Sequence, residues 1–472
     1  MNKSIFFKWC FFCFVIICFL TKQGVAQESN LLRELRIPQI AQENPGARIP
    51  YNGHISIPGA GRIQTSISLP LNYGDIMSIS NNTLKKIRRS IAVENINQID
   101  VINFGFRFSN KNYISVNATV KTDMHFSLKK DIASFIIEGN APFEGKTMSF
   151  LGRDFISINA YAEVGLGYNR EVNDNLSFGV NAKYLLGLAN AYAKKAKMDL
   201  HTSNRFEELT LSHTIDGRFA GALNVDDVIE HINNYGFENM GDSVKLDFSE
   251  IPQSLKNHGF AVDFGAHYRI NEWFDVNASV LDLGFIRWKT NTWQYNVKDR
   301  SFPITGYSYE DIAGENDNIE EFKPADYLYE IVDSLESIFV SELKSSASYT
   351  KWLNAKINIG GSFYINEHNR VNAVFNGKFI NSNFIPSGTI SYVYTVGKWF
   401  DIIVGNTFRR NAILNPGVGV NFTAYIFQFY AVVNYTNSFF YIDKTKNINF
   451  AIGLNFVAPQ KKDKRTKASY PY

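Results

Sequence analysis

The chain has 472 residues, a formal net charge of +3, and a composition that is 45% hydrophobic, 15% aromatic and 20% charged. It is too long for an ordinary single sandwich domain, and no nucleic-acid-binding module or metal-ligand cluster stands out. All three cysteines, Cys10, Cys13 and Cys18, lie in the first 26 residues. If that segment is removed, disulfides and thiolate metal sites are excluded, and we expect no cofactor.

The first residues predict a secretory signal peptide. Lys3 and Lys8 precede an apolar run over residues 9–20 that is too short to anchor in a bilayer, and small residues follow at positions 24–26. We therefore expect cleavage after Ala26. The rest of the chain divides by pattern into an N-terminal periplasmic or plug segment (27–53), a strand-rich region (54–458) and a basic periplasmic tail (459–472).

Residues 158–186 alternate strictly on both sides of an Asn-Asp-Asn turn at 173–175. One set is apolar, whereas the other holds Asn, Gly, Glu163 and Lys183. A period of two predicts strands with two unlike environments. Pairing Tyr168 with Phe178 would place Glu163 opposite Lys183 on the polar face, so we expect an ion pair there. This hairpin alone fits a soluble sandwich with one wet face as well as a membrane barrel.

The same alternation recurs along the chain, at residues 102–121, 260–269, 354–359 and 447–456. A soluble sandwich would need a second layer to cover each apolar face, whereas a closed barrel in a membrane needs none. The 39 Phe and 24 Tyr fit the apolar band and aromatic girdles of outer-membrane barrels. The sequence therefore predicts an all-β fold, a transmembrane antiparallel β-barrel in the outer membrane with lipid outside and water within.

The spacing of turns predicts about fourteen strands. Tight turns are expected near 110–112, 172–175, 271–273, 366–369, 397–399 and 425–426, and longer connections at 71–98, 129–154, 201–258, 300–348, 381–385, 410–416 and 437–446. Short periplasmic turns alternating with longer outer loops would leave both chain ends in the periplasm. Trp273 and Trp399 flank two of the short turns, where an interfacial aromatic belt is expected, although ordinary packing explains each tryptophan alone.

Some long connections have a pattern of their own. Residues 324–344 hold apolar residues at helical spacing, which predicts a short helix within a long loop. Residues 310–344 contain eleven acidic and two basic residues. A solvated acidic loop explains this composition, and a docking surface for a partner or a cation is the sharper alternative.

Several stretches carry a family resemblance: "NPGARIP", "SISLPLNYGD", "YAEVGLGYNREVNDNLSFGVNAKYLLGLANA" and "SVLDLGFIRWKTNTW". Together they resemble an uncharacterised family of outer-membrane β-barrel proteins from Bacteroidota. That family is similar in plan to fatty-acid-transporter-like barrels and to barrels associated with type IX secretion and gliding. The resemblance implies fourteen strands and an outer-membrane location, and it implies no catalytic residue. The last predicted strand ends at Phe456 and a tail follows to Tyr472, so either aromatic could be the signal that the barrel-assembly machinery reads.

The polar face supplies the candidate functional residues. We expect these side chains to point into the lumen: Arg107, Lys121, Asp123, His125, Glu163, Lys183, Asp263, His267, Arg269 and Lys356. Asp123 with His125, and Asp263 with His267, share a face and could orient an imidazole as a general base. A water-filled lumen is lined by such ionisable groups whether or not they catalyse a reaction, so we expect a protein that is not an enzyme.

Two functions remain open from the sequence. The first is passive transport of a small or hydrophobic solute through a barrel that is mostly plugged, because a fourteen-stranded barrel is wide enough to need filling. The second is a structural or assembly role, in which the acidic loop and the basic tail bind envelope partners related to secretion or gliding. The expected partners are outer-membrane lipid, the barrel-assembly machinery, and a hydrophobic ligand or an envelope protein, with no nucleic acid.

Overall fold

The computed structural model describes residues 30–69, 71–72, 74, 87, 90–138, 141–204, 208–222, 230, 255–304, 343–380, 383–409, 414–436 and 446–459. The predicted signal peptide, the acidic loop up to residue 342 with its helix, and the tail beyond residue 459 lie outside these residues. Among the described residues, no helix is both long and apolar enough to span a membrane.

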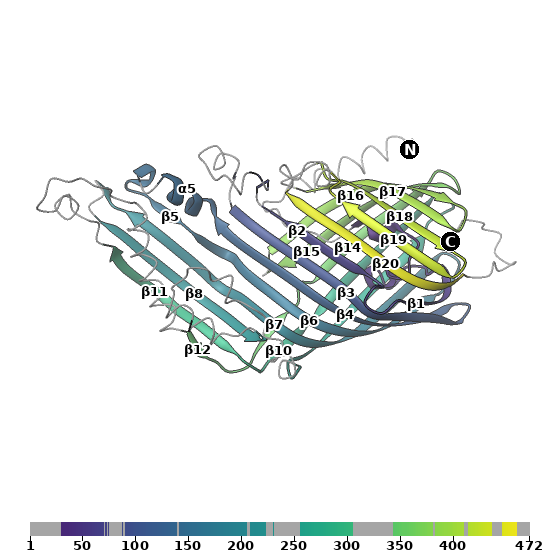
Figure 1. Cartoon of the computed structure of the whole chain (residues 1–472), viewed down its shortest axis with the longest axis horizontal. Helices are drawn as coiled ribbons and strands as arrows, with labels where there is room; N and C mark the ends of the chain where they lie inside the picture. The colour runs from purple at the N-terminus through teal and green to yellow at the C-terminus, as the bar shows by residue number, and fades with distance from the viewer. Residues whose placement is uncertain are drawn as a thin grey trace, which may run out of the picture.

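One antiparallel sheet of twenty strand segments dominates the structure (Figure 1). The segments are β1 (Tyr51–Ser56), β2 (Ile63–Ser68), β3 (Ser90–Ser109), β4 (Asn112–Lys129), β5 (Thr147–Ser149), β6 (Leu151–Glu171), β7 (Leu176–Thr202), β8 (Leu209–Gly221), β9 (His258–Arg269), β10 (Phe274–Trp288), β11 (Trp293–Ile304), β12 (Leu343–Ser345), β13 (Tyr349–Trp352), β14 (Lys356–Tyr364), β15 (Asn369–Ile380), β16 (Asn383–Val396), β17 (Phe400–Phe408), β18 (Pro416–Ala424), β19 (Phe427–Asn434) and β20 (Asn447–Pro459). In the described part of the chain, four short helices accompany them: η1 (Asn30–Glu34), α2 (Ile40–Glu43), α5 (Lys130–Glu138) and η2 (Ala141–Phe143).

The twenty segments make a closed barrel of fourteen strands, which confirms the predicted fold. Several segments are successive pieces of one interrupted strand. Both β1 and β2 pair with β3 and β20, and both β8 and β9 pair with β7. Likewise β10 and β11 follow each other along β9 and β8, and β12, β13 and β14 follow each other along β11 and β10. Because β20 pairs back to β1 and β2, the sheet has no free edge at its seam.

The two faces of the wall differ as the alternation predicts. On β6, Val164 and Leu166 are about half exposed, at 47% and 58%, whereas Glu163, next to Val164, is buried. On β7, Phe178 is exposed and Lys183 is buried. An exposed apolar face all around a closed sheet, with polar groups buried inside it, is what a barrel in lipid requires.

The predicted register between β6 and β7 was wrong. Tyr168 pairs with Val180, and Lys183 lies opposite Gly165 instead of Glu163. The Asn173 side chain explains the shift, because its Oδ1 accepts hydrogen bonds from the backbone N–H groups of Asn175 and Leu176 and so sets the turn length. The shift is two residues, so each side chain keeps the face that was predicted.

Five of the predicted long connections were also wrong in detail. The stretch 71–98 contains the start of β3, and 129–154 contains β5 and the start of β6. The stretch 201–258 contains β8. Both β8 and β9 pair with β7, so they are two pieces of one interrupted strand, and residues 222–257 separate them in the sequence. The stretch 300–348 contains the end of β11 and all of β12. Only two residues separate β15 from β16, where a longer loop was expected at 381–385. An interrupted strand looks like a loop in sequence, because its two halves are brought into line only by backbone pairing with the same neighbouring strand.

Candidate functional site: a plugged lumen

The N-terminal segment 30–50 lies inside the ring of strands. Its helix η1 contacts β16, β17, β18 and β19. Four apolar side chains of the segment are almost fully buried and form one cluster with inward-facing residues of the wall, made up of Leu31, Leu32, Leu35 and Ile37 with Val393, Ile403, Tyr430, Val432 and Ala451. The segment therefore plugs the lumen by hydrophobic packing on this side of the barrel.

The same segment also reaches the opposite wall. Asn169 on β6 donates a hydrogen bond from Nδ2 to the carbonyl of Pro45 (2.6 Å), and Ser177 on β7 donates from Oγ to the carbonyl of Gly46 (2.7 Å). A Cβ at Gly179 would lie 2.1 Å from the Pro45 carbonyl oxygen. Only a glycine at that wall position lets the backbone of the plug come so close.

Ion pairs tie the plug to the wall at two further points. The Arg36 guanidinium lies 2.7 Å from the Asp401 carboxylate on β17. Glu43 pairs at 2.8 Å with Arg62, a fully buried side chain that follows the break between β1 and β2. Burial raises the pKa of the Glu34 carboxyl above its ordinary value, against the lowering effect of Arg370 and Arg33.

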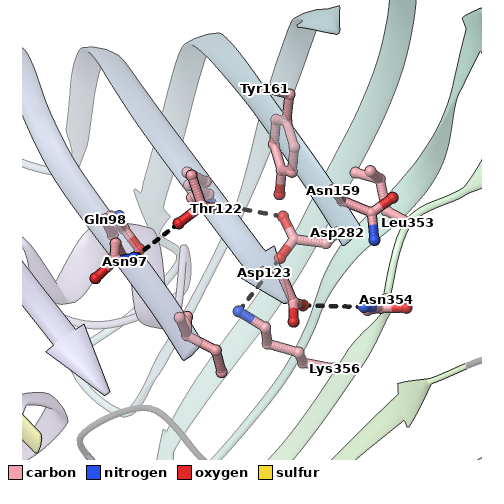
Figure 2. Close-up of a pocket in the computed structure, with 12 residues that line it drawn as sticks. Asn97, Gln98, Thr122, Asp123, Asn159, Tyr161, Asp282, Leu353, Asn354 and Lys356 are labelled. Carbon is pink, nitrogen blue, oxygen red and sulfur yellow. Dashed lines mark hydrogen bonds and ion pairs between the residues drawn. The ribbon is translucent and has the colours of Figure 1, made fainter. Parts of the chain in front are cut away.

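An ionic cluster crosses the lumen between the strands β4, β6, β7, β9, β10 and β14. Lys183 Nζ lies 2.7 Å from both Asp263 and Asp282, and Lys121 Nζ lies 3.0 Å from Glu163. Lys356 lies 3.5 Å from Asp282 on its other side. Figure 2 shows Asp282 and Asp123 pointing into one pocket together with Lys356 and Asn354. The cavity left there is about 20 Å³, which is the size of a water site.

Asp282 was not predicted from the sequence. It has φ of 59° and sits at a β-bulge where the register of β10 against β9 shifts between Val280 and Leu283. The bulge turns this carboxylate inward, where the plain alternation would have turned it outward. The sequence did contain a signal for this bulge. Asp282 lies between Leu281 and Leu283, at a position where the alternation predicts an outward-facing apolar residue.

An apolar layer lies directly beside the ionic cluster, toward the long-connection end. Tyr161, Leu185 and Ala261 stand two residues from Glu163, Lys183 and Asp263 on the same strands, and all three are buried. They pack in one cluster with Ala220, Ile286, Trp288 and Leu353. This layer and the charges share one pocket, which Tyr161 and Leu353 line together with Asp282.

The other predicted lumen residues have charged partners of their own. Asp123 pairs with Lys378 at 2.8 Å, and Arg107 pairs with Glu171 at 2.8 Å. His125 lies 2.6 Å from Glu94. His267 lies 3.3 Å from Asp275, and Arg269 is half-buried on β9. The partner residues Glu94, Asp275 and Lys378 were missed. Glu94 lies directly opposite His125 in the β3–β4 hairpin, and Asp275 lies in the hairpin of β9 and β10, so hairpin pairing was the available signal for both. Lys378 on β15 is distant in sequence from Asp123, and such a pairing leaves no local pattern.

Trp273 and Trp399 are each about half exposed beside short turns, at 48% and 51%. Trp399 packs edge-on against Phe422, so these side chains lie on the outer surface at the short-turn end. As for metals, no group of three or more histidine or acidic side chains suited to an ion occurs in the described part of the chain.

The fold and the site together define a closed fourteen-stranded β-barrel with a plugged lumen. Residues 45–434 match the model of a family of unknown function, DUF5723, and the chain belongs to that family. Curated proteins gave no significant match to this sequence.

Solved structures with the same type of barrel cover nearly the whole chain. The toluene transporter TbuX of Ralstonia pickettii is 9% identical over 93% of this chain and 96% of its own, with a TM-score of 0.41. The toluene transporter TodX of Pseudomonas putida is 8% identical over 89% and 91%, with a TM-score of 0.37. A FadL homologue from Pseudomonas aeruginosa is 10% identical over 89% and 93%, with a TM-score of 0.36. Identities this low do not bear on what this chain carries.

Proposed function

We propose that the protein is an outer-membrane channel for passive transport of a small solute with an apolar part, and that residues 30–50 hold it closed. The observation that carries the proposal is the seat built for this segment inside the barrel. Wall glycines such as Gly179 make room for its backbone, a wall carboxylate pairs with Arg36, and a wall cluster receives Leu31. A defined seat for a separate segment is what a gate requires.

The plug is held by many non-covalent contacts, and each of them contributes only a small part of the binding free energy. Burying one leucine contributes about 1.5–3 kcal/mol, and this is an upper estimate. The longest helix of the segment has five residues, so the plug can leave without unfolding the wall. Opening would then be a shift between two populated states of one barrel.

The apolar layer in the lumen supports a solute with an apolar part. It contains Trp288 and lies beside the ionic cluster with Lys183. In the ionic cluster the lysines and carboxylates neutralise one another, so they offer a small polar solute exchangeable hydrogen bonds. We assign these groups to the transport path and not to catalysis.

Tethering the plug tests the proposal. The predicted mature chain has no cysteine, so Arg36→Cys with Asp401→Cys places one thiol pair across the plug–wall contact. A reducible bis-methanethiosulfonate linker should abolish uptake of the apolar dye N-phenylnaphthylamine by intact cells and L-arabinose flux in proteoliposomes. Reduction of the linker should restore both, because only the tether then changes.

The matched control links two residues of the wall and shares the Asp401→Cys substitution with the test variant. Asn421 on β18 pairs with Asp401 on β17, so Asp401→Cys with Asn421→Cys forms a bridge that leaves the plug free. Flux that is blocked equally in both variants would contradict gating by the plug. If neither probe is taken up through the untethered protein, the transport function itself fails, and a structural role with envelope partners takes its place.

A further inference from the structure

A second cavity lies between the plug and the wall at the short-turn end of the barrel. Its volume is about 90 Å³, several times what a water molecule needs. The plug contributes Arg33 and Arg48 to its lining, and the wall contributes His267, Asp275 and Arg370, with Tyr364 beside them. The transport path proposed above makes no use of this cavity.

Basic groups outnumber acidic ones around the cavity. Four arginines and a histidine line it against two carboxylates, those of Glu34 and Asp275. Arg36, the fourth arginine, is paired with Asp401 outside the cavity. Arg48 donates hydrogen bonds to the main-chain carbonyls of Asn173 and Asp174, which are neutral partners. The cavity is therefore suited to an anion.

Unused hydrogen-bonding atoms point to the same conclusion. Among the residues that line this cavity, Nε of Arg48, Nε of Arg370 and Nδ1 of His267 are buried nitrogen atoms without a hydrogen-bond partner in the described part of the chain. Nη2 of Arg36 also has no hydrogen-bond partner there, but it is ion-paired with Asp401. The two arginine Nε atoms are buried donors, and Nδ1 of His267 is a third when the imidazole carries both protons, so a ligand that accepts these bonds would be stabilised.

The state of Asp275 selects the kind of anion. Its Oδ2 accepts a hydrogen bond from Tyr364 (2.7 Å) and lies 3.3 Å from His267, whereas its Oδ1 is buried without a hydrogen-bond partner. A ligand that satisfies the whole cavity must accept from guanidinium groups and also donate to a carboxylate. Phosphate keeps at least one proton at neutral pH and can do both, whereas sulfate and a carboxylate carry no proton to donate.

We propose that this cavity binds inorganic phosphate, from the periplasmic side. Bound there, the anion bridges Arg48 of the plug to Arg370 of the wall and so adds a tie that holds the plug in its seat. The binding itself is independent of the transport function, and only the effect on the plug rests on that proposal.

Calorimetric titration of the purified mature protein in detergent tests the binding. Inorganic phosphate should bind saturably at neutral pH, and sodium sulfate at the same ionic strength should bind at least tenfold more weakly. Arg48→Gln and Arg370→Gln should each weaken phosphate about tenfold. Asp275→Asn should reduce the preference for phosphate over sulfate, because an amide can donate to sulfate. Glycerol phosphate as a third titrant distinguishes an ester from the free ion.

The matched control is Arg107→Gln. Arg107 also joins plug and wall, through the carbonyl of Ile49 and the carboxylate of Glu171, but it does not line the cavity. Each variant should show the heat-dependent gel mobility of a folded barrel before it is titrated. The proposal is overturned if wild-type protein gives no saturable heat with phosphate, if sulfate binds equally well, or if Arg107→Gln weakens phosphate as much as Arg48→Gln. None of these outcomes depends on solute flux.

Discussion

Buried charges are the most demanding residues of this barrel. Lys183 is only 4% exposed and has carboxylates of Asp263 and Asp282 at 2.7 Å, with Glu163 at 3.8 Å. A buried ion pair gains little over an apolar replacement of the whole pair, but removal of one partner leaves an uncompensated charge. The expected ion pair of Glu163 with Lys183 is present in a weaker form than predicted, since Lys121 is the closer partner of Glu163.

We predict that Lys183→Met lowers the free energy of unfolding by about 3–5 kcal/mol, because Asp263 and Asp282 then share a buried site without their cation. Urea unfolding of the protein in detergent measures the change. Lys195→Met is the control on the same strand, since the Lys195 side chain is exposed, and it should shift stability by less than about 0.5 kcal/mol. Equal effects of the two substitutions would show that the ionic cluster has no special role.

At the scale of elements, the plug and the wall are built for each other. Leu31 lies against Gly405 and Gly417 of β17 and β18, and a Cβ on either glycine would lie 2.7 Å from a methyl carbon of Leu31. The helix α5 contributes differently, because Ile132 and Phe135 pack against the apolar cluster with Leu200 and Leu211 on the long strands β7 and β8. The plug is the one of these two elements that fills the lumen.

Truncation of the plug leucines should open the channel. We predict that Leu31→Ala combined with Leu35→Ala raises uptake of N-phenylnaphthylamine by intact cells severalfold, because each buried leucine-to-alanine change costs about 2–5 kcal/mol of packing. The wall should stay folded, as seen from unchanged heat-dependent gel mobility. Leu166→Ala, on the exposed face of β6, controls for general weakening of the barrel. Uptake that stays at the wild-type rate in the double variant would argue against a plug held by packing.

For the whole molecule, closure is the decisive property. The last strand β20 pairs with β19 on one side and with β1 and β2 on the other, so it joins the end of the chain to its beginning. Without it, both neighbours would expose unpaired backbone groups to hydrocarbon, where each costs several kcal/mol. The barrel therefore folds as a unit whose seam forms from the most distant parts of the sequence.

Removal of residues 447–472 should abolish assembly, whereas removal of 460–472 should not, because Phe456 at the end of β20 then remains as the terminal aromatic. Outer-membrane fractionation and heat-dependent gel mobility of the two truncated proteins measure this. A protein that fails to assemble when only 460–472 are removed would show that the assembly machinery reads Tyr472.

The two faces of the wall and the number of strands could be predicted from the amino-acid sequence alone. Side chains on a strand alternate with a period of two, so the contrast between Glu163 and its apolar neighbours could be read from a single segment. The register at Asn173, the inward turn of Asp282, the break between β8 and β9, and the pairing of Asp123 with Lys378 became visible only in the folded chain. The seat of the plug belongs with these, because it depends on contacts such as Arg36 with Asp401 between residues far apart in the chain. Pattern is local and survives in the sequence, whereas pairing and closure depend on which distant strands meet.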